Sequence, residues 1–359
     1  MAKLGDICTV VSGSTPKTGV AEYWDGTVKW ITPAELNEDS FYITDSVRHI
    51  TEDGKEKTGL SYLPKGTVIL SSRAPIGKTA IAGCEMCCNQ GFKNLICSDA
   101  VYNEYLYFFL KSKTNYLNSL GRGATFKEIS KSIVEKIEIP LPNIEKQHQI
   151  VKELKATRNL IAHRKQQLTK LDELIKARFV EMFGDPYTNS KDYPLKKGES
   201  FFKLSNGKAV PESKRLNGGI PAYGGNGISW YTDESLFDAD TIVVGRVGFQ
   251  SGNVHLVKGP LWVTDNAMYM SSCDFSQYNL TFLIELMAHV DFTKFQDAGD
   301  LKKITQKPFM QFEYLCPPLS LQNQFSAFVA EVDKSKVEVQ KALDQTQLLF
   351  DSLMQQYFG

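Results

Sequence analysis

Two long segments of this chain, residues 144–183 and 321–357, contain neither proline nor glycine. A helix of about 40 residues would be roughly 60 Å long at 1.5 Å per residue, which is longer than most helices of globular proteins. In the first segment, aliphatic residues recur every seven positions, at Leu154, Ile161, Leu168 and Ile175. Because this is the repeat of a coiled-coil seam, we expect a long helix that pairs with another helix. An amphipathic helix lying on a globular core is the alternative.

The second segment carries a similar apolar stripe, with Lys336 and Thr346 as polar interruptions. Its seam positions include Val332, Val339, Leu343 and Phe350. Residues 143–183 hold nine Lys and Arg against five Asp and Glu, whereas residues 317–359 hold three against five. Since helices of opposite net charge attract, the pattern favours an antiparallel pair within the chain. The eight seam residues are its predicted partner-binding positions.

The chain also repeats itself. Residues 174–184 read LIKARFVEMFG, and residues 349–359 read LFDSLMQQYFG. A proline-containing stretch precedes each long segment, at residues 139–144 and 316–321. The expected order is globular segment, long helix, globular segment, long helix, with boundaries at residues 1–142, 143–184, 185–316 and 317–359. Two such repeats predict approximate twofold symmetry, which suits a target with two separated halves.

Composition narrows the function. The net charge is zero, which argues against a simple polyanion binder, so a nucleic-acid surface must be local or must be completed by a partner. No apolar run approaches the roughly 18 residues that span a bilayer, and the first residues lack the apolar region of a signal peptide. We therefore expect a cytoplasmic protein without a membrane partner. For Cys84, Cys87 and Cys88, buried free thiols are favoured over a zinc site.

Familiar catalytic motifs are incomplete. Gly77-Lys78-Thr79 resembles the end of a phosphate-binding loop, but Ser72 replaces the required glycine and a strand-like run follows. Gly184-Asp185-Pro186-Tyr187 resembles the signature of adenine-N6 methyltransferases without its second proline, and a turn after a helix end explains it more simply. The five histidines are scattered. The sequence therefore predicts no catalytic residue, metal or cofactor on this chain.

Without a catalytic motif, the remaining functional candidates are polar and cationic side chains in the turns of both globular segments, which could recognise a nucleic acid. Arg, Asn and Gln can read base edges, and Lys suits phosphates; taken singly, each such residue is more simply an ordinary surface residue. Arg73 and Arg246 form the strongest pair, because similar strands precede them. The candidate DNA-binding residues of the first segment are Thr15, Lys17, Arg73, Lys78, Asn89, Gln90, Lys93, Arg122, Thr125 and Lys127. Those of the second segment are Lys208, Tyr223, Asn226, Arg246, Asn266, Lys302 and Lys303.

These features together resemble the DNA-specificity subunit of type I restriction–modification systems. The resemblance covers the whole chain and is carried by the repeated order, Gln147 early on the first helix, and residues 12–16, 122–125 and 179–186. It implies an α+β fold, in which two α/β target-recognition domains are joined by two long antiparallel coiled-coil helices. Each domain would read one half of an asymmetric bipartite DNA site, and the helices would fix the spacer.

The same resemblance implies partners that carry the chemistry. Two methyltransferase subunits would bring S-adenosylmethionine and the adenine-N6 reaction, with two ATP-dependent motor–nuclease subunits as optional further partners. Two other hypotheses stay open from the residues alone. A standalone DNA-modifying enzyme would need a cofactor loop or an acidic metal cluster, and a coiled-coil scaffold without a DNA role would show no sequence-selective binding.

Overall fold

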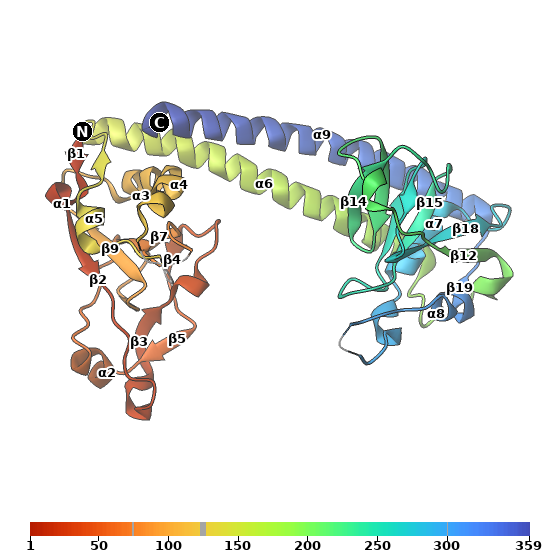
Figure 1. Cartoon of the computed structure of the whole chain (residues 1–359), viewed down its shortest axis with the longest axis horizontal. Coiled ribbons are helices and arrows are strands. Elements are labelled where there is room, and N and C mark those ends of the chain that lie inside the picture. The colour runs from red at the N-terminus through yellow and green to blue at the C-terminus, as the bar shows by residue number, and fades with distance from the viewer. Residues whose placement is uncertain (74, 123–126, 300) are drawn as a thin grey trace. The chain divides into compact units, whose positions relative to one another are not determined.

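The computed structural model describes residues 1–73, 75–122, 127–299 and 301–359. The chain divides into two compact units (Figure 1). Unit 1 comprises residues 1–164 and 342–359, and unit 2 comprises residues 165–341. Each of the long helices, α6 (Ile144–Phe183) and α9 (Leu319–Phe358), is therefore divided between the two units. In the described residues, no helix is both long and apolar enough to cross a membrane.

Unit 1 is built on a mainly antiparallel sheet, in which only the β4–β7 pair is parallel. In spatial order its strands are β2 (Cys8–Ser12), β9 (Phe92–Cys97), β6 (Val68–Ser71), β7 (Thr79–Ala82) and β4 (Tyr42–Ile43). A smaller sheet contains β5 (Arg48–Ile50), β3 (Trp24–Ile31) and β8 (Cys87–Cys88), and β1 (Ala2–Lys3) pairs with β10 (Glu138–Ile139). The helices are α1 (Leu4–Ile7), α2 (Glu52–Lys57), α3 (Asn103–Ser112), α4 (Thr114–Leu120) and α5 (Lys131–Glu135), with 3-10 turns η1 (Ala21–Tyr23) and η2 (Pro33–Glu35).

Unit 2 repeats this frame. Its main sheet has the order β12 (Phe202–Asn206), β18 (Ala267–Cys273), β15 (Thr241–Gly245) and β16 (Val254–Val257). The smaller sheet contains β14 (Gly227–Thr232), β13 (Ile220–Gly224) and β17 (Trp262–Val263), and β11 (Leu195–Lys197) pairs with β19 (Glu313–Leu315). The helices are α7 (Leu280–Ala288) and α8 (Lys307–Gln311), with 3-10 turns η3 (Gly198–Ser200), η4 (Glu212–Lys214) and η5 (Phe292–Phe295).

Local sequence sets the ends of α6. The Asn143 side chain accepts a hydrogen bond from the Lys146 N–H over 2.9 Å, which is the contact of a helix N-cap. At the other end, Gly184 has a φ of +76°, and its N–H donates to the Val180 carbonyl over 2.8 Å. Glycine is favoured at such a left-handed closing position. The predicted span of residues 144–183 is confirmed, and α9 begins two residues before the predicted 321.

The ends of both long helices complete the cores. In unit 1, Phe358 from the last turn of α9 is buried, with its ring 5.2 Å from Tyr105 and 5.9 Å from Phe109. In unit 2, Phe183 from the last turn of α6 lies 4.6 Å from Phe282 and 5.5 Å from Phe325. Each core is therefore closed by aromatic side chains from a long helix.

Five of the eight predicted seam residues are buried. Leu154, Ile161, Ile175, Val332 and Leu343 are buried, and Leu168, Val339 and Phe350 are half-buried. In unit 2, Lys336 contacts Asp172 over 2.7 Å and Phe325 contacts Phe179, so the two helices run antiparallel there. The predicted α+β class with antiparallel long helices is confirmed. Two further leucines of α6, Leu160 and Leu174, are exposed.

A buried glutamine joins each long helix to its unit by the same three hydrogen bonds. The Gln147 side chain accepts from the Tyr102 N–H over 2.8 Å and donates to the carbonyls of Ala100 and Pro142. The Gln322 side chain accepts from the Asn279 N–H over 2.8 Å and donates to the carbonyls of Gln277 and Pro317. One side chain thus satisfies three backbone groups in each unit.

Replacing Gln147 or Gln322 by methionine is expected to lower the free energy of unfolding by about 1–3 kcal/mol, because buried backbone groups lose their partners. The control is Gln166→Met, since Gln166 is exposed on the same helix as Gln147. Denaturant unfolding of the three variants measures the difference. Equal stability of Gln147→Met and Gln166→Met would contradict the role of this contact.

A second contact ties α6 to unit 1. The Lys155 ammonium lies 2.7 Å from the Glu104 carboxylate, which also accepts from the Tyr42 hydroxyl over 2.6 Å. Burial alone would raise the pKa of Glu104, but hydrogen bonds from Lys155 and the tyrosines outweigh it and hold this pKa below its ordinary value of 4.5. The stabilisation is therefore present above pH 4.5 and is lost as the pH falls through the lowered pKa.

Glu104→Gln is expected to lower the free energy of unfolding by about 1–3 kcal/mol at neutral pH, because a hydrogen bond between charged groups is lost. The variant and the parent protein should converge in stability below the lowered pKa of Glu104. Unfolding curves across the acid range test this, with the exposed Glu181→Gln as a control expected to change little. A stability gap that is independent of pH would refute the ion-pair explanation.

Candidate nucleic-acid interface

In unit 1, one carboxylate organises the loops at the end of β6. The Arg73 Nε lies 2.9 Å from one oxygen of Glu128, and the Lys93 Nζ lies 3.2 Å from the other. The segments themselves pair, since the Ile129 N–H donates to the Ser72 carbonyl over 2.9 Å and Arg122 bridges to Glu128. Burial would raise the pKa of Glu128, but the bonds from Arg73 and Lys93 outweigh it and lower this pKa.

One of the predicted DNA-binding residues, Lys93, is buried in this cluster. Lys93 is only 6% exposed, and its ammonium also donates to the Ser72 hydroxyl over 3.4 Å. The structure thus places the Lys93 ammonium inside unit 1, paired with a carboxylate, rather than on an open surface. Arg73 keeps an exposed side chain, with about half of it open to solvent, and Glu128 holds its guanidinium in place.

Other predicted residues of unit 1 lie near this cluster. The Ser72 N–H donates to the Gly91 carbonyl over 2.7 Å, which sets the turn at residues 89–91 beside the loop after β6. In that turn the Asn89 side chain accepts from the Gly91 N–H, and Gln90 contacts Thr15. The Lys78 ammonium donates to the Pro33 carbonyl over 3.2 Å. Lys17, Arg122 and Lys127 are exposed, and Thr125 lies outside the described residues.

Unit 2 gathers its predicted residues at the same end of its sheet. The Arg246 N–H donates to the Asn266 carbonyl over 2.9 Å, and the Arg246 carbonyl accepts from the Ile304 N–H over 3.0 Å. Val247 bridges to Lys303, and the Gly248 N–H donates to the Lys302 carbonyl over 2.8 Å. Arg246, Asn266, Lys302 and Lys303 therefore come from three segments that touch.

The remaining candidates of unit 2 surround that contact. The Thr264 N–H donates to the Tyr223 carbonyl over 2.9 Å, and the Lys208 N–H donates to the Val263 carbonyl over 2.8 Å. Both residues thus lie beside the strand that leads to Asn266. Tyr223 is half-buried, whereas Lys208 and Asn226 are exposed.

The hydrogen bonds also correct the predicted match between the two arginines. The Gly77 N–H donates to the Ser71 carbonyl, and the Gly252 N–H donates to the Gly245 carbonyl. The carbonyls of the next residues, Ser72 and Arg246, accept from the N–H groups of Ile129 and Ile304 respectively. Arg246 therefore corresponds to Ser72, and Val247 corresponds to Arg73. The predicted pairing is one position out, because Arg73 stands two residues after Ser71, whereas Arg246 stands one residue after the equivalent Gly245.

The equivalent positions therefore carry different chemistry. Glu128 of unit 1 corresponds to Lys303 of unit 2, since they bridge to Arg73 and Val247 respectively. Arg246 has no carboxylate at that position, and its guanidinium donates to the Asp265 carbonyl at 3.5 Å. Sequence reasoning missed Glu128 as a site residue, although Lys127-Glu128-Ile129 and Lys302-Lys303-Ile304 share a Lys-x-Ile pattern that could have pointed to it.

The three clustered cysteines, Cys84, Cys87 and Cys88, are free thiols. Burial raises the pKa of Cys87 to about 11 and that of Cys88 to about 12, and the Cys88 sulfur accepts from the Asn94 amide over 2.9 Å. Cys84 donates to the Thr44 carbonyl over 3.2 Å. Within the part of the chain that the structure describes, no group of three His, Cys, Asp or Glu side chains could hold a metal ion.

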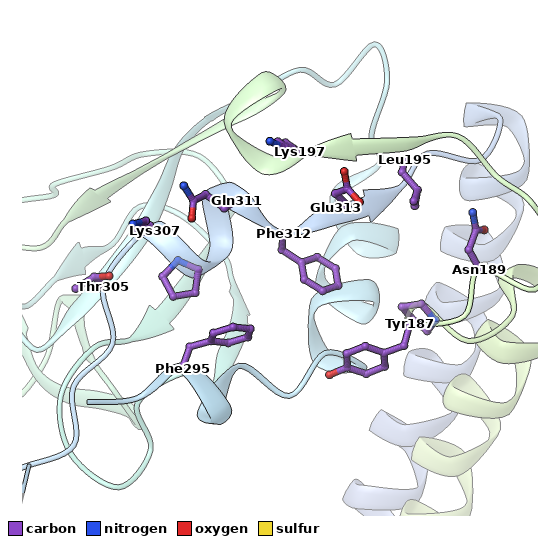
Figure 2. Close-up of a pocket in the computed structure, with 12 residues that line it drawn as sticks. Tyr187, Asn189, Leu195, Lys197, Phe295, Thr305, Lys307, Gln311, Phe312 and Glu313 are labelled. Carbon is purple, nitrogen blue, oxygen red and sulfur yellow. The ribbon is translucent and has the colours of Figure 1, made fainter. Parts of the chain in front are cut away.

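A cavity of about 640 Å³ lies elsewhere in unit 2, between α8 and the segment after α6. Figure 2 shows Tyr187, Phe295 and Phe312 around it, with Lys197, Lys307 and Glu313 also in the lining. The rings of Tyr187 and Phe312 meet edge to face with centroids 6.5 Å apart. Its lining thus combines three aromatic rings with polar and charged side chains.

Comparison with known proteins places the chain. The profile of the family described as "Type I restriction modification DNA specificity domain" matches residues 1–173. The type I restriction enzyme MjaIX specificity subunit of Methanocaldococcus jannaschii is 37% identical over 263 residues, which are 72% of this chain and 58% of that protein. The chain belongs to the type I restriction–modification DNA-specificity family.

Further members extend the similarity over both units. The type I restriction enzyme EcoprrI specificity subunit of Escherichia coli is 23% identical over 292 residues, covering 75% of this chain and 71% of that protein. The type I restriction–modification S subunit of M. genitalium has the same fold, with a TM-score of 0.62, 17% identity and coverage of 99% of this chain and 95% of that one. The first of the curated specificity subunits named above is matched over little more than half of its own length.

Proposed function

We propose that this chain is the DNA-recognition component of a type I restriction–modification complex, in which each unit reads one half of a bipartite duplex site. One observation carries the proposal. Each unit gathers cationic and amide side chains at the same end of its main sheet, on an equivalent frame but with different residues. Such side chains suit base edges and phosphates, and different residues suit different half-sites.

The two target-recognition domains would be residues 1–142 and 185–316. Residues 143–184 and 317–359, which contain α6 and α9, would act as the spacer that fixes the separation of the half-sites. A continuous helix resists bending more than a flexible linker does. This proposal assigns the helices a mechanical role and assigns the loops after β6 and β15 the reading role.

The chemistry would come from partners. Two methyltransferase subunits would bring S-adenosylmethionine and supply part of the phosphate-binding surface, which is consistent with the zero net charge of this chain. Two motor–nuclease subunits would join in complexes that also cleave DNA. This chain would contribute binding and orientation in the cytoplasm and no catalytic residue of its own.

Inserting one base pair into the spacer of the target is expected to abolish its methylation by the assembled complex. The insertion shifts one half-site by about 3.4 Å along the axis and rotates it, so only one unit can bind and the avidity of linked sites is lost. The control is a base substitution in the spacer that preserves its length, which should have no effect. Equal methylation at both spacer lengths would refute the spacer role of the helices.

Arg73→Ala and Arg246→Ala are each expected to weaken specific binding by about 1–3 kcal/mol and to relax only one half-site. Binding of the assembled complex to targets mutated in one half or the other measures this. Lys136→Ala is the control, because Lys136 is an exposed cation far from the candidate site. The neighbouring Ile137 accepts a hydrogen bond from the Leu4 N–H, just before the start of β2, at the end of the sheet opposite to Arg73. Relaxation of both half-sites by one substitution would contradict separate reading by the two units.

A further inference from the structure

The side chain of Phe249 is unusually open to solvent. It is 90% exposed, more than any other large hydrophobic residue in the described part of the chain. Water disfavours exposed aromatic surface, and an isolated apolar residue on a surface needs no function. The position of Phe249 is therefore informative only if its surroundings suggest what would cover it.

The backbone around Phe249 is held in place. Within the turn, the Ser251 N–H donates to the Gly248 carbonyl over 3.0 Å, and the Asn253 N–H donates to the Gln250 carbonyl over 3.1 Å. Gly248 has a φ of +93°, a conformation that favours glycine. Ser251 is fully buried, and its carbonyl accepts from the Gln296 amide over 2.6 Å. The ring thus projects from a turn anchored to the body of unit 2.

The residues beside this turn are mostly cationic or amide side chains. Gly248 is hydrogen-bonded to Lys302, Val247 bridges to Lys303, and Arg246 is hydrogen-bonded to Asn266. Two carboxylates are also near, since Asp265 precedes Asn266 and the Asp297 N–H donates to the Lys303 carbonyl. Three cations against two carboxylates leave a net positive rim around an apolar tip.

We propose that Phe249 is a wedge that inserts into the base stack of the half-site read by unit 2. The inference rests on the proposed function and adds a mode of recognition to it. Duplex DNA presents phosphates outside and stacked bases inside, so cations at the rim and an apolar ring at the tip match its two surfaces. Inserted apolar side chains unstack a base step and make binding depend on how easily that step deforms.

The equivalent loop of unit 1, residues 72–76, contains no aromatic residue. Five residues separate Ser71 from Gly77, whereas six separate the equivalent Gly245 from Gly252. Ile76 and Ser251 each precede the equivalent glycine, and both are buried. The residue before Ile76 is Pro75. The extra residue of unit 2 lies in the segment that carries Phe249. The distortion is therefore expected in one half-site only.

The test uses the complex assembled with its methyltransferase subunits and duplexes that contain the methylated motif. 2-Aminopurine, whose fluorescence rises when it is unstacked, is placed at successive positions of both half-sites, away from the methylated adenine. Binding of the parent complex should raise the fluorescence at one step of the unit 2 half-site. Phe249→Ala should remove that rise and weaken binding by roughly 5- to 150-fold, the range for loss of one stacked base, whereas Phe249→Trp should retain both.

Phe275→Ala is the matched control, because Phe275 is another exposed phenylalanine of unit 2 that follows β18 at the opposite end of the sheet. It should change neither fluorescence nor affinity. An unchanged fluorescence rise and affinity in Phe249→Ala would overturn the wedge alone. Impaired assembly with the methyltransferase and an unchanged DNA signal would also overturn it, by making the ring a protein contact. Absence of sequence-selective binding by the parent complex would overturn the proposed function together with the wedge.

Discussion

The packing of the long helices into both cores is the constraint on which the rest of the structure depends. Phe358 is buried against Tyr105 and Phe109 in unit 1, although it lies near the end of the sequence. Phe183 closes the core of unit 2 against Phe282 and Phe325. Because these rings belong to helices that also carry the seam, neither core can be completed without the helix pair. The loops that gather the candidate DNA-binding residues are held on these cores.

A common frame with different surfaces explains how two similar units could recognise different sequences. Gln147 and Gln322 make the same three contacts with backbone groups, and the main sheets share the order of four strands, to which unit 1 adds β4. The loops at the sheet end differ in charge and length. Glu128 holds Arg73 in unit 1, whereas unit 2 has Lys303 at the equivalent position and a longer loop that presents Phe249.

Much of the framework was predictable from the sequence, because its signals are periodic or local. The absence of proline and glycine, the seven-residue repeat and Gly184 defined α6 to the residue. The candidate site could be predicted less well from the sequence than the framework. Lys93 is buried by an ion pair that brings together β9 and the segment at residue 128, and no local pattern predicts such a contact. Arg73 stands two residues after Ser71, whereas Arg246 stands one residue after the equivalent Gly245, and only the backbone hydrogen bonds reveal which positions are equivalent.

The most direct test is to sequence the methylated adenines in the genome of cells that express this chain with its methyltransferase partner. Two different recognition surfaces on one helix pair predict a single bipartite motif, with two unlike half-sequences and a spacer of constant length. Methylation at one contiguous sequence, at half-sites with variable spacing, or at the same sites without this chain would contradict the account.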